Sequence, residues 1–290
     1  MKPINYRILS LFLFIIISWG IAWPINKMGL NYMSPLWYTT TRLLIGTAVM
    51  FMFVIAMKKF AFPQRHDWPL IATIGLLQVG LYILLVNIGL ARIPAGHAAM
   101  LAYTTPLWIM PIATFFFKEE ATFSKWVGFL LAITGLLILL SPWEIDWSDS
   151  QVLVGCMMLL LASLCWAISI FCARYMTWRK SPLQLMPWKL LVGTLPILLF
   201  AWIKEPQVNT VWNQDLILSL LYTGALVTGL SYWCGILVSK ELPSTIVSLG
   251  FLGVPLCSTL TSAMFMHEAI TLPTASAMGL IVLGLVFVTT

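Results

Sequence analysis

The chain has 290 residues, of which 60% are hydrophobic and 9% are charged, and its formal net charge is +6. Soluble domains carry about a quarter charged residues, so this composition excludes a soluble globular protein. The basic excess does not indicate a nucleic-acid partner, because membrane topology accounts for where the basic residues lie.

Long apolar segments follow one another along the whole chain. Each is long enough to cross a hydrocarbon core of about 30 Å as a helix. Alternating strands of a membrane barrel are not seen, so each segment is predicted to be a helix. In chain order the ten segments are residues 7–28, 35–57, 69–91, 95–117, 123–142, 152–174, 183–202, 214–238, 243–266 and 271–289. We therefore predict an all-α integral membrane protein with ten transmembrane helices.

Basic residues gather at alternate connections between these segments. The odd-numbered connections hold only Lys27, Arg92 and Lys204, whereas the N-terminus and the even-numbered connections, with their flanks, hold eleven of the sixteen Lys and Arg residues. These eleven are Lys2, Arg7, Lys58, Lys59, Arg65, Lys118, Lys125, Arg174, Arg179, Lys180 and Lys240. The positive-inside rule then predicts a multi-pass protein of a bacterial-type inner (plasma) membrane, with both termini in the cytoplasm.

The chain also repeats itself. Residues 93–119 and 242–268 share a proline at the second position, a proline twelve residues later and a closing glutamate. These two stretches lie 149 positions apart. At the same offset, identical residues pair from Gly75 with Gly224 to Gly135 with Gly284. At an offset of 147, Trp19 meets Trp166, and "RLLIGT" at 42–47 meets "KLLVGT" at 189–194.

Each repeat holds five predicted helices. Because five is an odd number, the second copy must cross the membrane in the opposite sense to the first. Inverted repeats of this kind allow a transporter to open alternately to the two sides of the membrane. We therefore predict two inverted five-helix repeats, residues 1–146 and 147–290.

Several motifs resemble one family. "SWGIAWPINKMG", "TRLLIGT", "GLARIPAGHAAMLAYTTPLWIMPIATFFFKEE" and "GFLLAITGLLILL" are similar to segments of the drug/metabolite transporter superfamily, specifically its EamA-type branch. The resemblance covers essentially the whole chain. It implies a ten-helix fold of two inverted repeats around a central cavity, and export of small metabolites.

Aromatic and polar residues on helix faces provide the candidate substrate site. Residues four apart share a helix face, and aromatic walls with a few polar groups suit amphipathic small molecules. An alternative for many of the tryptophans is a place in the interfacial belts or in helix packing. The candidates are Trp19, Trp23, Asn26, Gln78, Tyr82, His97, Tyr103, Thr104, Trp108, Trp166, Ser231 and Tyr232.

Arg42 and Lys189 are the only formal charges well inside predicted helices. A basic residue at a helix centre costs about 2.5–3.5 kcal/mol on insertion scales. Such a residue therefore serves as a gate or binds a substrate anion, or else it snorkels to the headgroups or braces helices. Pro106 and Pro255 are the hinge candidates, with ordinary structural kinks as the alternative.

No Asp or Glu lies in the middle of a predicted helix, and there is no HExxH motif, so we do not expect an enzyme. The five cysteines fall within the segments without a CxxC pair, so we expect free thiols, no metal site and no cofactor.

The expected function is secondary transport that exports small organic metabolites, amino acids or related amphipathic compounds, by alternating access. A broad amphipathic-drug exporter and a lipid-linked metabolite flippase remain alternatives. The expected partners are a small-molecule substrate and membrane lipids. A monomer is the working expectation.

Overall fold

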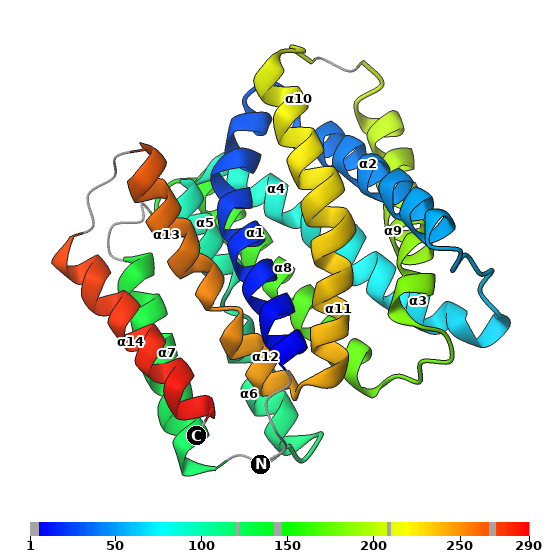
Figure 1. The fold of residues 1–290 in the computed structure, drawn as a ribbon. Helices are drawn as coiled ribbons and strands as arrows, with labels where there is room; N and C mark the ends of the chain where they lie inside the picture. The colour runs from blue at the N-terminus through cyan, green and yellow to red at the C-terminus, as the bar shows by residue number, and fades with distance from the viewer. Residues whose placement is uncertain (1–5, 120–121, 142–146, 208–209, 267–270, 290) are drawn as a thin grey trace.

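The computed structural model describes residues 6–119, 122–141, 147–207, 210–266 and 271–289. Within these ranges every extended regular element is a helix, and the one β-bridge joins Met33 to Thr210. The helices form a single bundle, with α1 running through its middle (Figure 1). The all-α prediction is confirmed.

In the described part of the first half there are nine helical elements. They are α1 (Tyr6–Leu30), α2 (Pro35–Ala56), η1 (Arg65–Asp67), α3 (Trp68–Ile74), η2 (Gly75–Leu81), α4 (Tyr82–Arg92), α5 (Ala95–Ala102), α6 (Thr105–Phe115) and α7 (Phe123–Leu140). The second half holds α8 (Ser150–Tyr175), α9 (Pro182–Lys204), α10 (Gln214–Leu221), η4 (Tyr222–Ser231), α11 (Tyr232–Glu241), α12 (Ser244–Gly250), α13 (Gly253–Met266) and α14 (Leu272–Thr289).

These elements account for the predicted membrane crossings. Nine helical stretches of the described residues are long and apolar enough to cross a membrane, and α14 contributes a shorter apolar stretch, Leu272–Phe287. Large hydrophobic side chains on the outer faces are exposed, for example Leu13, Met52, Leu199 and Leu283. Exposed apolar side chains at this density are expected for helices that face lipid.

The repeated "SP" dipeptide marks the same helix start in each half. The Ser34 hydroxyl accepts a hydrogen bond from the Trp37 amide at 3.4 Å, and Pro35 follows at the first helical position of α2. The Ser181 hydroxyl accepts from the Gln184 amide at 3.3 Å at the start of α9. Serine caps the otherwise unpaired amides of a first turn, and proline lacks the amide that would be unpaired there.

Two of the predicted spans in each half are interrupted, at places that are equivalent between the halves. The third and eighth spans contain the π-helical segments η2 and η4, and η2 shifted by 149 residues lies within η4. The fourth and ninth spans, predicted as single helices, each divide in two: α5 gives way to α6 at Tyr103–Thr104, and α12 to α13 at Phe251–Leu252. Pro106 and Pro255 lie in the first turn after these breaks, where a missing amide is tolerated.

Helix α2 packs against its sequence equivalent, α9, in the antiparallel sense. The Trp37 indole donates to the Glu205 carbonyl (2.8 Å), and at the other end Phe51 contacts Trp188 with ring centroids 5.4 Å apart. Between these contacts the hydroxyls of Thr47 and Thr194 lie 3.2 Å apart. These two threonines are themselves equivalent at the offset of 147, so the two helices cross at matching residues.

Helices α7 and α14 form the other pair of equivalents, side by side at one edge of the bundle (Figure 1). Near one end Ser124 donates to the Phe287 carbonyl at 2.6 Å. A Cβ added to Gly135, farther along α7, would lie 2.6 Å from the Ala277 carbonyl oxygen. Residue numbers therefore rise along α7 as they fall along α14, and this pair is antiparallel too.

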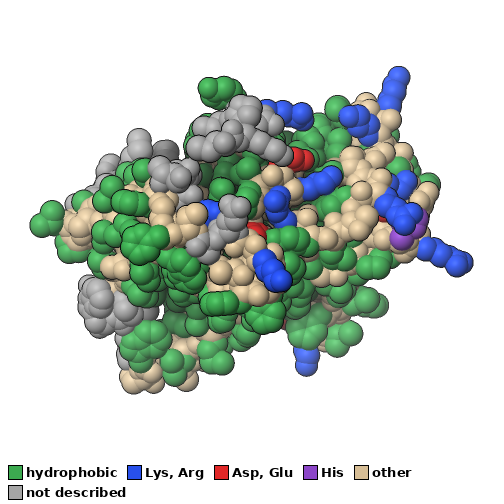
Figure 2. All heavy atoms as spheres, turned by 90° about the horizontal axis from the view of Figure 1, so that it is seen from below, with side chains coloured by type: hydrophobic (Ala, Val, Ile, Leu, Met, Phe, Trp, Pro, Cys, Tyr) green, Lys and Arg blue, Asp and Glu red, His purple; other side chains and the backbone are tan. Residues whose placement is uncertain are grey.

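Basic side chains are spread over the end of the bundle that Figure 2 shows, on a surface that is otherwise mostly hydrophobic. Lys58, Lys59, Arg65, Lys118 and Arg179 are exposed, and all belong to the even-numbered connections of the predicted topology.

Candidate functional site

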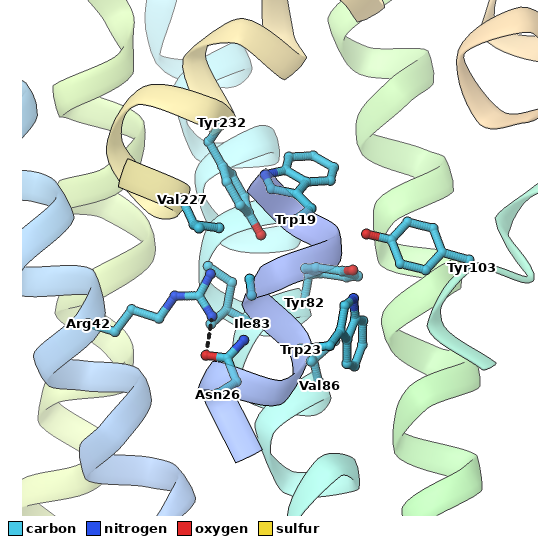
Figure 3. A pocket seen from close by; sticks show the side chains of 11 residues that line it. Trp19, Trp23, Asn26, Arg42, Tyr82, Ile83, Val86, Tyr103, Val227 and Tyr232 are labelled. Carbon is cyan, nitrogen blue, oxygen red and sulfur yellow. Dashed lines mark hydrogen bonds between the residues drawn. The ribbon is translucent and has the colours of Figure 1, made fainter. Parts of the chain in front are cut away.

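A pocket lies between helices of both halves, with about 370 Å³ of empty space, including space open at its mouth. Its cavity volume proper is about 30 Å³, well below the roughly 300–1,000 Å³ usual for small-molecule sites, so the lining side chains are nearly closed on one another in this structure. Figure 3 shows its side chains converging from α1, α2, α4, the α5–α6 break, η4 and α11. They are Trp19, Ala22, Trp23, Asn26, Arg42, Tyr82, Ile83, Val86, Tyr103, Val227 and Tyr232.

Helix periodicity places one wall of the pocket. Trp19, Ala22, Trp23 and Asn26 are spaced three, four and seven residues from the first, which is one face of α1. The break between α5 and α6 places Tyr103 on another wall. Its backbone lies outside the helical region (φ −94°, ψ 15°), which ends α5 at this residue.

An aromatic cluster closes the end of the pocket. Trp19 is at its centre, with ring centroids 5.1 Å from Trp166, 5.4 Å from Tyr232 and 5.1 Å from Phe251. Tyr82 contacts Trp166 at 4.7 Å. These rings come from both halves of the chain, so the predicted equivalents Trp19 and Trp166 meet directly at the interface between the halves.

Arg42 supplies the charge of the pocket and is only 4% exposed. Its Nε donates to the Thr223 carbonyl (3.2 Å) and the Thr228 hydroxyl (2.8 Å). Its Nη1 donates to Asn26 Oδ1 (3.1 Å), the bond drawn in Figure 3. All three acceptors are neutral, so the guanidinium is held in place without a carboxylate partner among the described residues.

Lys189, the equivalent of Arg42, has a different environment. It is fully buried, and its Nζ has no hydrogen-bond partner in the part of the chain that the structure describes. The ammonium lies 3.9 Å from the centre of the Trp178 ring, outside the pocket. At the offsets of the repeat, Asn26 corresponds to Ala173 and Thr228 to Val79, so the two side chains that accept from Arg42 are replaced by apolar ones at the positions equivalent for Lys189.

Seven of the candidate residues therefore meet at one place. These are Trp19, Trp23, Asn26, Arg42, Tyr82, Tyr103 and Tyr232. Trp166 lies directly behind them in the aromatic cluster.

Other candidates connect helices instead of lining the pocket. Thr104 and Trp108 both donate to the hydroxyl of Ser163 on α8, at 3.1 and 2.8 Å. The Ser231 hydroxyl pairs with that of Ser18 at 2.8 Å and joins η4 to α1. These contacts hold the helices that carry the pocket residues.

Gln78 and His97 are not among the pocket residues. Gln78 and Tyr82 are four residues apart and were expected to share a face, but Gln78 belongs to η2. Gln78 is buried there, and its Oε1 has no hydrogen-bond partner among the described residues. His97 is half-buried near the start of α5.

Sequence reasoning missed the apolar lining residues Ala22, Ile83, Val86 and Val227. Ala22 lies on the face of α1 already predicted, so periodicity could have found it. No local signal separates the other three from ordinary core residues. Among the described residues no group of three His, Cys, Asp or Glu side chains could hold a metal ion.

Membrane-length helices around an aromatic pocket with one buried cation define a polytopic membrane protein with an internal pocket. The chain belongs to the EamA-like transporter family, whose model matches residues 7–141 and again 153–290. The two matches lie on either side of the predicted repeat boundary at 146/147.

Individual relatives agree with this assignment. The chain is 26% identical over 255 residues to an uncharacterized transporter of Bacillus subtilis, covering 88% of this chain and 87% of that one. It is 27% identical over 284 residues to a probable amino-acid metabolite efflux pump of Salmonella typhimurium, covering 94% and 91%. A crystal structure with 20% identity superposes with a TM-score of 0.77 over 97% of both chains, a likeness that concerns the fold alone.

Proposed function

We propose that this transporter exports small amphipathic organic metabolites, amino acids or related compounds, across a bacterial-type inner membrane. The observation that carries the proposal is the pocket, in which the aromatic rings of Trp19, Trp23 and Tyr82 stand beside the single cation of Arg42. Aromatic walls bind apolar bodies, and a few fixed polar groups orient them. Two relatives named probable amino-acid metabolite efflux pumps support the same substrate class. Transport, and not catalysis, is the proposed activity.

Alternating access between two inverted five-helix repeats is the proposed mechanism. Its support is the antiparallel packing of α2 on α9 and of α7 on α14, each helix against its sequence equivalent. Exchanging the conformations of two such halves converts a state open on one side into a state open on the other. The positive-inside distribution of Lys and Arg supports cytoplasmic termini.

The test is counterflow of labelled tryptophan, leucine and glutamate in proteoliposomes that contain the purified full chain. We expect saturable tryptophan exchange that is absent from empty vesicles, with glutamate exchanged more slowly because the pocket offers one cation and a mainly aromatic lining. Absence of exchange with all three amino acids would contradict the proposed substrate class.

Tyr82→Phe and Tyr82→Ala extend this test. Phenylalanine keeps the ring contact with Trp166, whereas alanine removes it, so the alanine variant should lose most tryptophan exchange and the phenylalanine variant should keep more of it. Equal exchange by both variants and the wild type would remove Tyr82 from the substrate site.

A further inference from the structure

We infer that the pocket recognises a carboxylate group of its substrate through Arg42, and that it discriminates against amines that lack a carboxylate. This inference rests on the proposed function and narrows its substrate class. It concerns the charge of the substrate group that the pocket selects, and the proposal that the protein exports amphipathic metabolites does not specify that charge.

The first argument is the set of donors that Arg42 leaves free. A guanidinium has five N–H groups. The Nε group and one group on Nη1 are used by Thr223, Thr228 and Asn26. Among the described residues nothing accepts from the remaining group on Nη1 or from the two on Nη2. One N–H on each terminal nitrogen forms the fork that binds a carboxylate through both of its oxygens.

The second argument is the absence of a counter-ion. No Asp or Glu lines the pocket, and in the part of the chain that the structure describes no carboxylate is a partner of Arg42. A buried charge without a partner is unfavourable in a low-dielectric interior. An anionic ligand would provide the missing charge, whereas a cationic ligand would add a second positive charge beside the first.

The third argument is the balance of hydrogen-bonding groups around Arg42. Tyr82 and Tyr232, whose hydroxyls can each donate, line the pocket, and the indole N–H of Trp19 is buried and has no partner among the described residues. The Asn26 carbonyl oxygen, an obvious acceptor for an ammonium group, is already occupied by Arg42. The pocket thus offers mainly donors, which a carboxylate satisfies.

The geometry also assigns the two ends of the ligand. Figure 3 shows the guanidinium of Arg42 reaching the pocket from one side, with the rings of Trp19, Trp23 and Tyr82 facing it. The carboxylate lies at Arg42 and the apolar body lies among these rings. An amino group, where present, has only ring faces and tyrosine oxygens to contact, which attract a cation weakly compared with a carboxylate.

The test uses three compounds with the same indole body. Indole-3-propionate carries only a carboxylate, tryptamine only an ammonium group, and tryptophan both. Binding to the purified full chain in detergent is measured by calorimetry. Indole-3-propionate and tryptophan are expected to bind, with tryptamine weaker by about tenfold or more, since a charge-assisted hydrogen-bond pair contributes at least that factor.

Asn26→Asp is the informative variant because an aspartate oxygen can still accept from Arg42, so the fold is kept while the pocket gains a carboxylate. Indole-3-propionate should then bind about tenfold more weakly or worse, and tryptamine should bind as well as or better than in the wild type. Arg42→Gln should abolish the discrimination. Lys189→Met is the matched control: it removes the other buried cation, which lies outside the pocket, and should leave the ratio between the two ligands unchanged.

The outcomes separate the inference from the proposed function. Tryptamine binding as tightly as indole-3-propionate to the wild type would overturn carboxylate recognition, even if tryptophan is transported. An unchanged ratio in Asn26→Asp would overturn it too. Binding of the carboxylates without any counterflow would contradict export and leave the recognition of carboxylates standing. No binding by any of the three compounds would overturn both.

Discussion

Arg42 and Lys189 occupy equivalent positions, yet the fold treats them differently. Arg42 makes three hydrogen bonds to neutral acceptors, whereas Lys189 makes none to the described residues and has the Trp178 ring beside its ammonium group. Buried charges are tolerated when their hydrogen bonds are satisfied and are costly when they are not. The same type of residue at the same point of the repeat should therefore contribute differently to stability.

We expect Arg42→Met to lower the free energy of unfolding by about 3 kcal/mol, because the buried oxygens of Asn26 and Thr228 lose their donor. Lys189→Met should change it by less than about 1 kcal/mol or raise it, since the lost ring contact is offset by the removal of an unpaired buried charge. Reversible unfolding of both variants in mixed micelles measures the difference. Equal losses in the two variants would contradict this account of Lys189.

At the scale of helices, the equivalent helices α7 and α14 pack with their backbones close together. Gly135 on α7 meets the backbone of α14, where an added Cβ would lie 2.6 Å from the Ala277 carbonyl oxygen. Gly279 on α14 has nothing within 4 Å of the corresponding position. Substituting each of these two glycines by alanine therefore separates two effects: a clash with the neighbouring helix at Gly135, and the higher helix propensity of alanine at Gly279.

Gly135→Ala should lower the melting temperature in detergent, because the backbones of α7 and α14 must separate to admit the methyl group. Gly279→Ala should be neutral or slightly stabilising, since alanine is favoured over glycine in a helix by about 1 kcal/mol. A melting temperature equally lowered by both changes would show that the α7–α14 contact is not as close as described.

Glu119 links the segment after α6 to two elements of the second half. Its carboxylate accepts from the Tyr175 hydroxyl (2.7 Å), from the amides of Ser244 (3.1 Å) and Thr245 (3.3 Å), and from the Thr245 hydroxyl (3.0 Å). Partial burial would raise the pKa of Glu119, but the hydrogen bonds from Tyr175, Ser244 and Thr245 outweigh it and hold the pKa below its ordinary value of 4.5. Its equivalent, Glu268, lies outside the described residues.

A lowered pKa in the folded state means that the charged carboxylate stabilises the fold. This contribution is present above the ordinary pKa of 4.5 and is lost as the pH falls through the lower folded-state pKa. Glu119→Gln should therefore reduce stability by about 1 kcal/mol at neutral pH, allowing for solvent screening at a half-buried site. The difference from the wild type should shrink below the ordinary pKa. Thermal unfolding of both proteins across this pH range measures it, and a constant difference would contradict the role of the charge.

At the scale of the whole molecule, the distribution of basic residues predicts the orientation in the membrane. Lys59 and Arg179 are exposed on even-numbered connections, and Ser150 and Trp212 are exposed at the ends of odd-numbered ones. The native cysteines lie within the helices, so they can be replaced to leave a background without thiols.

Single cysteines at Lys59 and Arg179 should react with a membrane-impermeant thiol reagent only after cells are opened. Cysteines at Ser150 and Trp212 should react in intact cells, because the positive-inside rule places these connections outside. Labelling of all four positions from one side would contradict the predicted topology, and labelling with the two sets exchanged would invert it.

Some features of this protein follow from sequence alone. Apolar length determines where helices can cross a membrane, because every backbone group in lipid must be paired within its own helix. The doubled "SP" begins a helix at sequence-equivalent places, since helix caps depend on a few neighbouring residues. The face of α1 that carries Trp19, Trp23 and Asn26 was likewise readable from helix periodicity.

The tertiary structure decided which candidates share a pocket. Helical spacing suggested both Gln78 and Tyr82 for the pocket, but only Tyr82 lines it. The break at Tyr103 brings that ring to the pocket, while Thr104 turns to Ser163. Arg42 and Lys189 differ because the acceptors that hold Arg42 come from other helices, α1 and η4. Local sequence determines where each helix begins and which side chains lie on each of its faces. Long-range packing determines which groups meet, because each contact depends on the position and rotation of two helices at once.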